Sequence, residues 1–287
     1  MSEKHIDDVS GIETTGHVWD GIRELNNPLP RWWVWTFHIT IVWAIGYCIA
    51  YPAWPLVSSA TKGMLGYSSR AEVEEEIANA KQAQSASIAK IASMDVEAIL
   101  ADDELRQFAT SAGAAAFKIN CIQCHGSGAQ GSAGYPNLND DDWLWGGTPE
   151  AIHQTIAHGI RYNGDDDTRV SEMPAFGEIL EPEEISQVAA YVVSLTGEPE
   201  DASLVDPGKT VFIDNCSSCH GENSEGMSDF GAPNLADAIW LYGHTEADIA
   251  RQIRKPRHGV MPAWQPRLGE TTVKELAVFV HGLGGGK

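Results

Sequence analysis

Two copies of the string Cys-x-x-Cys-His carry the clearest chemistry in this sequence, at residues 121–125 and 216–220. Two thiols three positions apart can bond the two vinyl groups on one edge of a porphyrin, and the histidine that follows then lies beneath the iron. The strings therefore predict two covalently attached haem c groups. The expected thioether links come from Cys121, Cys124, Cys216 and Cys219, and the expected proximal iron ligands are His125 and His220.

A methionine followed by proline lies downstream of each string and is the expected second axial ligand. Met173 lies 48 residues after His125, and Met261 lies 41 residues after His220. Thioether sulfur is a soft ligand that suits haem iron, and His/Met ligation raises the reduction potential. A redox dithiol or half of a zinc site would explain one string alone, but two strings with matching Met-Pro pairs favour haem.

The sequence leaves open which methionine serves which haem. Pairing within each copy is the simpler fold, so we expect Met173 on the first haem and Met261 on the second. Exchange of the two methionines between the copies is the alternative. Met227 is a weaker candidate because it lies in a Gly/Ser-rich loop where exposure is expected. Three further histidines are expected to be surface or packing residues: His153, His158 and His258.

Prolines and tryptophans at matching places are expected to support the two sites. Pro136 and Pro233 lie 11 and 13 residues past the string histidines. A backbone carbonyl there could accept a hydrogen bond from the imidazole N–H and fix the orientation of the ring. Ordinary turn prolines are the alternative. Trp143 and Trp240 could wall the haem or donate to a propionate, or they could simply pack in the core.

The residues around the two strings repeat along the chain. Gly113 and Phe117 precede the first string at the offsets that Gly208 and Phe212 keep before the second. The Met-Pro pairs repeat as well, although the first copy carries extra residues at 163–169. Repeats of this kind indicate two similar structural units joined in tandem.

Each copy also predicts helices at matching places. Thr148 and Thr245 are suited to cap the starts of two of them. Apolar residues at helical spacing predict a closing helix from Pro182 in the first copy and after Thr272 in the second. No clear strands are visible. The sequence thus predicts an all-α fold with two tandem class I-like cytochrome c domains, each too small for a thick core without a large apolar cofactor.

One segment near the N-terminus is suited to cross a membrane. No Asp, Glu, Lys or Arg occurs from Trp32 to Thr61, and Trp32 to Tyr51 supplies 20 residues before Pro52. A spanning helix needs about 20 apolar residues, and proline stops the helix. A cleaved signal peptide is the alternative, but the 31 residues that come first are mostly polar and acidic rather than short and basic.

These features divide the chain into five parts. The N-terminal part, residues 1–30, is polar, and little independent fold is expected there. The part that follows the membrane segment, residues 58–110, is rich in helix formers, and Ser69 with Glu72 forms a candidate capping box. A disordered linker is the alternative for this third part. The expected parts are an N-terminal segment (1–30), a transmembrane helix (31–57), a helical spacer (58–110), cytochrome c domain 1 (111–199) and cytochrome c domain 2 (203–287).

The charge of the chain narrows the choice of partners. The formal net charge of −21 argues against nucleic acid and anionic membrane surfaces, and it favours basic protein partners. Residues 119–208 carry a net charge of −14, whereas residues 209–287 carry −1. We therefore expect the first haem domain to receive electrons from a basic c-type cytochrome. General solubility is the alternative explanation.

The N-terminal stretch WDGIRELNNPLPRWW, from Trp19 to Trp33, and its continuation to Tyr51-Pro52 resemble the start of the CcoP (FixP) family. Members of this family are the dihaem subunit III of cbb3-type cytochrome c oxidases. The resemblance covers nearly the whole chain, from the anchor through the spacer to both cytochrome copies. The N-terminal stretch is its specific part, because the haem motifs alone would fit many dihaem cytochromes.

The resemblance implies a subunit of a respiratory complex in the bacterial inner membrane, active in oxidative phosphorylation. Such subunits pass electrons toward a monohaem subunit, CcoO, and a haem–copper subunit, CcoN, which reduces oxygen. Because haem c is attached on the periplasmic side, residues 62–287 are expected there and residues 1–30 in the cytoplasm, with a single pass between them. Haem ligation carries over onto Cys121, Cys124, His125, Met173, Cys216, Cys219, His220 and Met261.

The expected function is a one-electron relay, performed by a non-catalytic subunit of an oxidase. Six-coordinate iron leaves no position for a substrate, so oxygen reduction is expected in a partner subunit. A free-standing membrane-anchored dihaem shuttle is one alternative. A dihaem peroxidase, which needs a haem with an open position, is the other.

Overall fold

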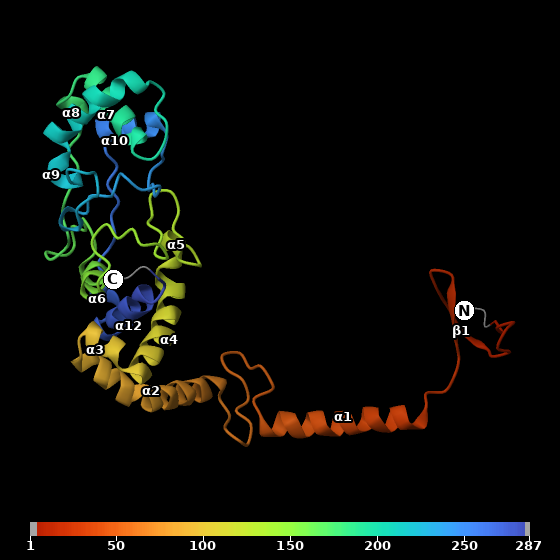
Figure 1. The fold of residues 1–287 in the computed structure, drawn as a ribbon. Helices are drawn as coiled ribbons and strands as arrows, with labels where there is room; N and C mark the ends of the chain where they lie inside the picture. Colours follow the sequence, from red (N-terminus) through yellow and green to blue (C-terminus); the bar gives the residue numbers. More distant parts are fainter. Residues whose placement is uncertain (1–4, 285–287) are drawn as a thin grey trace. The chain divides into compact units, whose positions relative to one another are not determined.

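The computed structural model describes residues 5–284, and Figure 1 shows their fold as helices joined by loops. The chain forms two compact units, one ending at Ala83 and the other beginning at Gln84. Helices dominate the described part of the chain, as the sequence predicts.

A β-hairpin near the N-terminus corrects the expectation that this segment has little fold of its own. β1 (Thr14–Trp19) pairs antiparallel with β2 (Ile22–Leu25). Asp20 and Gly21 connect the strands with φ angles of 49° and 84°. A two-residue hairpin turn of type I′ has left-handed backbone at both turn positions, and Asp-Gly adopts it readily.

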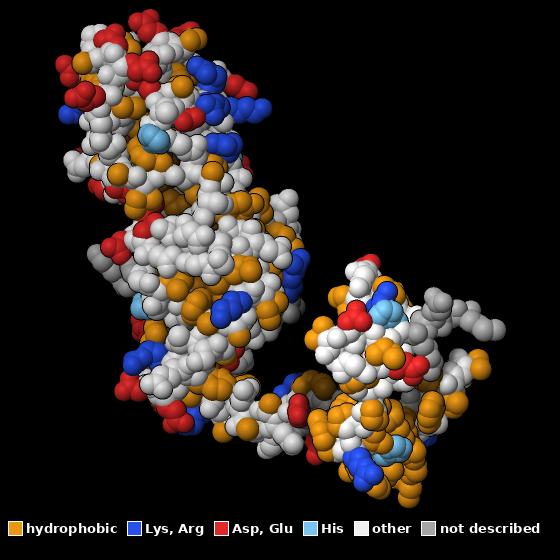
Figure 2. All heavy atoms as spheres, turned by 90° about the vertical axis from the view of Figure 1, so that its right-hand side faces the viewer, with side chains coloured by type: hydrophobic (Ala, Val, Ile, Leu, Met, Phe, Trp, Pro, Cys, Tyr) orange, Lys and Arg blue, Asp and Glu red, His pale blue; other side chains and the backbone are white. Residues whose placement is uncertain are grey.

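α1 (Arg31–Ala50) is the helix predicted to span a membrane. Its mean hydropathy is 1.5, none of its residues is buried, and among residues 5–284 it is the one helix long and apolar enough to cross. Most of its large hydrophobic side chains are exposed, and hydrophobic side chains gather at the end of the helix that faces the viewer in Figure 2. The helix ends ahead of Pro52, so residues 51–57 of the expected span lie outside it.

α2 (Ser69–Ser93) is a continuous helix where the spacer is expected. Its cap differs from the predicted box. The hydroxyl of Ser68, rather than that of Ser69, accepts a hydrogen bond from the N–H of Ala71 at 3.3 Å. The carboxylate of Glu72 accepts instead from the hydroxyl of Tyr67 at 2.6 Å.

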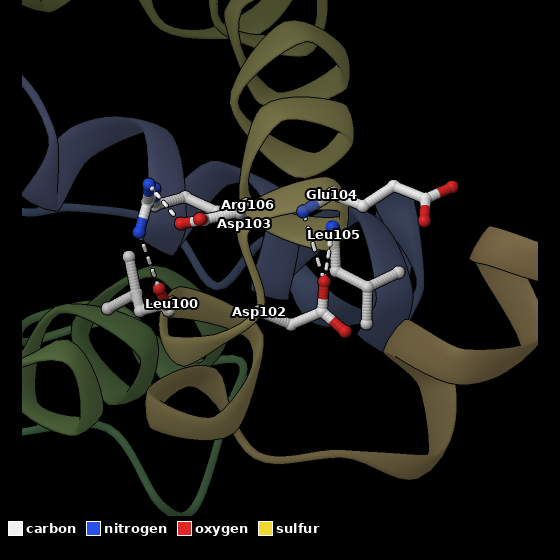
Figure 3. Close-up of polar contacts among 6 residues, drawn as sticks. All are labelled: Leu100, Asp102, Asp103, Glu104, Leu105 and Arg106. Carbon is white, nitrogen blue, oxygen red and sulfur yellow. Dashed lines mark hydrogen bonds and ion pairs between the residues drawn. The ribbon is translucent and has the colours of Figure 1, made fainter.

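Two helices then begin inside the expected spacer, α3 (Val96–Ala101) and α4 (Asp103–Asn120). The carboxylate of Asp102 caps α4 by accepting from the N–H groups of Glu104 and Leu105 at 3.0 and 3.1 Å, as Figure 3 shows. An N-cap of this kind stabilises a helix by about 1 kcal/mol. The helical body around the first string therefore starts earlier than residue 111.

The junction between α3 and α4 belongs to the core of that body. Arg106 donates to the carbonyl of Leu100 at 3.0 Å and pairs with Asp103 at 2.6 Å (Figure 3). Ile91 and Ile99 are fully buried in the same cluster as the helices that follow. The C-terminal end of the spacer is therefore part of the folded core rather than a flexible linker.

The rest of the C-terminal unit consists of short helices. Thr148 and Thr245 cap two of them through hydrogen bonds from backbone N–H groups at 3.2 and 3.1 Å, which confirms the predicted caps. The helices are α5 (Ile122–His125), α6 (Pro149–His158), η1 (Phe176–Glu178), α7 (Pro182–Ser194), η2 (Ala202–Leu204), α8 (Val205–Asn215), α9 (Ser217–His220), η3 (Ser228–Phe230), α10 (Glu246–Arg254), α11 (Gln265–Leu268) and α12 (Glu270–His281). The closing helix α12 begins two residues before the predicted Thr272.

These helices form two lobes, and each lobe combines parts of both sequence repeats. In the first lobe, α12 of the second repeat packs against α4 and α6 of the first. In the second lobe, α7 of the first repeat packs against α8 and α10 of the second. The repeats are tandem in sequence, but the lobes do not follow the expected ranges 111–199 and 203–287. We define the first lobe as residues 84–160 and 261–284 and the second as residues 170–258, because the two core clusters fall within these ranges.

Two equivalent glycines allow the closing helices to pack on the other repeat. A Cβ atom on Gly113 in α4 would overlap the backbone of Glu275 in α12. A Cβ atom on Gly208 in α8 would overlap the backbone of Gln187 in α7. The repeated Gly-Phe pattern of the sequence therefore has a packing cause, which is close contact between helices of different repeats.

Aromatic rings complete each of these helix crossings. The rings of Phe117 and Phe279 lie 5.3 Å apart between centroids, and those of Tyr191 and Phe212 lie 5.2 Å apart. Both pairs are tilted, and their centroid separations lie in the range that aromatic pairs prefer. The two lobes thus repeat the same packing, with a partner helix exchanged between them.

Candidate haem sites

The first Cys-x-x-Cys-His string lies where α4 ends and α5 begins. The ring Nδ1 of His125 lies 3.1 Å from the carbonyl oxygen of Pro136, which confirms the predicted contact. Because the carbonyl can only accept, Nδ1–H donates and Nε2 is left with its lone pair for a metal. Burial lowers the pKa of His125, and the hydrogen bond to Pro136 opposes this effect. The imidazole is therefore held in the neutral form that binds metal.

An apolar cavity adjoins this histidine. It is partly open to solvent and lined almost entirely by apolar side chains, as is usual for sites that bind apolar cofactors. Cys121 and His125 lie on its wall, and Met261 from the second repeat lines it as well. Trp143 is part of the wall, as one of the two sequence interpretations held. Apolar residues make up most of the remaining lining: Leu138, Trp145, Ile152, Ile156, Leu276 and Val280.

The second string has the same local geometry at the start of α9. The ring Nδ1 of His220 lies 3.0 Å from the carbonyl oxygen of Pro233, again as predicted. His220 is 9% exposed, and burial lowers its pKa. Met173 and Cys216 both pack against the core of the second lobe, together with Trp240. A neutral imidazole, a thiol and a thioether are therefore gathered in this lobe too.

One thiol of each string differs in acidity from the reactive thiol of redox-active pairs. Burial raises the pKa of Cys121 and of Cys216 to about 11 in each case. Redox-active Cys-x-x-Cys pairs instead hold a thiolate by lowering the pKa of one thiol. This difference in acidity argues against the dithiol alternative.

Neither methionine packs in the lobe of the histidine from its own repeat. Met261 lines the cavity beside His125, and Met173 packs in the lobe that holds His220. Each methionine lies nine residues before the helix that packs on the other repeat, α7 or α12, so it crosses with that part of the chain. The packing thus places each methionine in the lobe that holds the string of the other repeat.

The weaker ligand candidates lie elsewhere, as expected. Met227 is 38% exposed. His153 pairs with Glu270 at 3.3 Å, and His158 pairs with Asp165 at 3.1 Å. The ring Nε2 of His258 is buried and has no hydrogen-bond partner among the described residues. None of these three histidines is among the residues that line the cavity.

The sequence analysis did not identify two arginines that lie beside the sites. Arg169 donates to the carbonyl of Trp145 and lies 5.6 Å from the centroid of its ring. Arg257 donates to the carbonyl of Tyr242 at 3.0 Å and lies 4.5 Å from that ring centroid. Each arginine lies four residues before a methionine. This equal spacing was the signal that could have identified them.

The fold and the sites define a c-type cytochrome with a membrane anchor, because apolar walls surround the thiol, imidazole and thioether groups that bind haem c. Comparison with family models identifies the family within this class of cytochromes. Residues 11–58 match the N-terminal domain of cytochrome oxidase-cbb3, FixP, and residues 108–192 and 203–280 match cytochrome c oxidase, cbb3-type, subunit III. The chain belongs to this family of cbb3-type oxidase subunits, known as FixP or CcoP.

Relatives of full length agree with the family models. The chain is 66% identical to the cbb3-type cytochrome c oxidase subunit FixP of Rhizobium meliloti (strain 1021), over 99% of this chain and 98% of that protein. It is 55% identical to subunit CcoP of Cereibacter sphaeroides, over 96% and 95% of the two chains. Identity to subunit CcoP of Azospirillum brasilense is 49% over the whole of both. The resemblance seen in the N-terminal stretch is confirmed.

Proposed function

We propose that this chain relays single electrons within a cbb3-type cytochrome c oxidase, from a donor cytochrome toward the subunit that reduces oxygen. The observation that carries the proposal is the apolar cavity shared by Cys121, His125 and Met261. Imidazole and thioether together complete the coordination of haem iron and raise its potential. A haem held in this way supplies reversible one-electron chemistry.

The proposed cofactors are two haem c groups with exchanged axial methionines. The first is linked to Cys121 and Cys124, and the second to Cys216 and Cys219. The axial pairs are His125 with Met261 and His220 with Met173. Support comes from Met261 in the first cavity, and from Met173 in the core cluster that also contains Cys216.

The protein's part in the relay is to orient the ligands and to exclude water. The carbonyls of Pro136 and Pro233 hold the two imidazoles in fixed orientations. Trp143 and Leu276 wall the first cavity with apolar surface. Two protein ligands on each iron leave no position for a substrate. The chain therefore acts as a non-catalytic electron-transfer subunit of the oxidase.

The proposed location is the bacterial inner membrane, crossed once by α1. The C-terminal unit lies on the periplasmic side, where haem c is attached, and residues 1–30 lie in the cytoplasm. The proposed partners are a CcoO-like monohaem subunit and a CcoN-like haem–copper subunit. The names of the relatives, as subunits of the oxidase, support this assembly.

The donor is proposed to be a basic c-type cytochrome that docks on the second lobe. Residues 170–258 hold sixteen acidic and five basic residues, a net charge of −11. Residues 84–160 and 261–284 of the first lobe hold eleven acidic and five basic residues, a net charge of −6. Exchange of the closing helices thus moves the acidic excess from the expected first haem domain to the second lobe.

Gentle detergent extraction tests the proposed function. We expect the chain to co-purify with haem–copper and monohaem subunits, and the preparation to show absorption bands of haem b beside haem c. The denatured chain should retain two haems. A lone chain with two haems would favour the free shuttle instead, and peroxide turnover by the isolated chain would favour the peroxidase.

A variant that carries only the first haem tests the exchanged pairing. Cys216→Ser with Cys219→Ser removes the second attachment site. In this background, Met261→Ala should abolish the sulfur-to-iron charge-transfer absorption of the ferric protein, and Met173→Ala should leave it unchanged. The opposite result would establish pairing within each repeat.

A further inference from the structure

Arg161 lies where the chain crosses between the two lobes, in the middle of three short backbone segments. On one side, Ile160 pairs with Met261 through two N–H to oxygen bonds of 2.9 and 3.0 Å. On the other side, the N–H of Arg161 donates to the carbonyl of Arg169 at 2.8 Å. The segment of Arg161 thus separates the two segments that lead to the proposed methionine ligands.

The side chain of Arg161 bonds to both neighbouring segments. Its Nε donates to the carbonyl of Gly259 at 2.8 Å, and its Nη1 donates to the carbonyl of Ser171 at 2.8 Å. Gly259 lies two residues before Met261, and Ser171 lies two residues before Met173. One rigid guanidinium group therefore holds equivalent points of both methionine loops.

The backbone conformation of Arg161 supports a specific role. Its φ angle of 51° lies in the left-handed region, which residues other than glycine seldom adopt. Such conformations persist where the surrounding structure requires them, and they are common at functional sites. Here the conformation accompanies a side chain that is half-buried between the loops and bonded to both.

We propose that Arg161 is a positioning residue that holds both axial methionines at once and so couples the ligation of the two haems. The inference rests on the proposed function, because it takes Met173 and Met261 as iron ligands. Opening of one methionine loop moves one carbonyl away from the guanidinium. The group is then less firmly fixed for its bond to the other loop, so loss of sulfur at one haem makes loss at the other easier.

Imidazole binding to the full-length ferric chain tests this inference, because imidazole must displace the sulfur before it binds iron. We expect Arg161→Leu to raise the imidazole binding rate about tenfold at both haems, which corresponds to about 1.4 kcal/mol. The sulfur-to-iron charge-transfer absorption should weaken at both as well. The haems are distinguished in Met173→Ala and Met261→Ala backgrounds, each of which leaves one sulfur-ligated haem.

Two further variants make the result decisive. Arg106→Leu is the control, because Arg106, like Arg161, donates to a backbone carbonyl. It lies at the start of α4, where it pairs with Asp103, and touches neither methionine loop. Arg161→Lys keeps the charge but cannot reach both carbonyls with one rigid fork. If Arg161→Leu does not accumulate, the lysine variant should still raise the rate at both haems by at least about threefold.

The outcomes separate this inference from the function on which it rests. Wild-type protein with fewer than two haems, or without sulfur ligation, would contradict the proposed function itself. A normal wild-type protein whose Arg161 variants behave like Arg106→Leu would contradict only the role of Arg161. A rate change confined to one haem would also contradict the inference, because coupling requires both to respond.

Discussion

Glu275 is a buried carboxylic acid on α12, the helix that closes the first lobe. It is only 7% exposed, and burial raises its pKa from 4.5 to about 7. The folded protein therefore keeps a proton that the unfolded chain releases between pH 4.5 and 7. Stability consequently falls as the pH rises through this window, and the loss is complete above it.

Replacement of Glu275 by glutamine should remove this loss. We expect Glu275→Gln to match the wild type near pH 4.5 and to exceed its free energy of unfolding by about 2–3 kcal/mol at pH 8. Urea unfolding of the purified chain at several pH values measures the difference. Glu97→Gln, on an exposed side chain of α3, is the control and should leave the pH profile unchanged. Parallel profiles for Glu275→Gln and wild type would refute the assignment.

Single residues of the sites were largely predictable because their geometry is local. Cys121 and His125 are four positions apart, so their relation does not depend on the rest of the fold. The hydrogen bonds to Pro136 and Pro233 also form within short loops. Arg161 was not predictable, because its role depends on a carbonyl 98 residues away in sequence.

At the scale of helices, two glycine contacts fix how the repeats exchange partners. Gly113→Ala should lower the free energy of unfolding by about 1–3 kcal/mol through overpacking against α12. Helix propensity alone would predict the opposite change, because alanine stabilises an isolated helix by about 1 kcal/mol relative to glycine. A loss of stability would therefore report the close contact with α12. Urea unfolding monitored by helical circular dichroism measures the effect.

Gly197→Ala, in the bend that follows α7, is the control for overpacking. A Cβ atom there would meet only the carbonyl of Val193, at an ordinary 3.8 Å. We expect this variant to be close to wild type in stability. Gly208→Ala should repeat the destabilisation of Gly113→Ala in the second lobe. A stabilising Gly113→Ala variant would show that α12 does not pack closely on α4.

The exchange of closing helices was not visible in the sequence. α7 and α12 present equivalent apolar stripes, and each would cover α4 or α8 equally well on pattern alone. What decides between them is the path of residues 159–173 between the lobes, which involves contacts distant in sequence. The β-hairpin, in contrast, had a readable local signal in Asp20-Gly21.

At the scale of the whole molecule, the exchange decides where negative charge gathers. Figure 2 shows acidic side chains at the end of the C-terminal unit where α7 and α8 lie. We expect a variant with Glu178, Glu183 and Glu198 changed to glutamine to slow oxidation of a basic donor cytochrome several-fold at low salt. Stopped-flow measurement at increasing ionic strength checks this, because salt should reduce the difference.

A triple variant of the first lobe is the control for this charge effect. Glu97, Glu104 and Glu150 are exposed acidic residues of that lobe. Their replacement by glutamine removes the same charge and should slow the donor much less. Equal slowing by both triple variants would show that total charge, rather than the second lobe, governs the encounter.

The crossing of the chain also sets an order of completion during synthesis. The segment that carries Met261 and α12 is the last to leave the ribosome, whereas Cys121 and His125 emerge well before it. The second lobe is finished as soon as residue 258 is made, yet the earlier pocket still lacks its far wall. A chain that stops short of Met261 would lack both the methionine proposed for the first haem and the helix that fills the core of the first lobe. A premature stop would therefore cost the whole first lobe rather than yield a shorter relay.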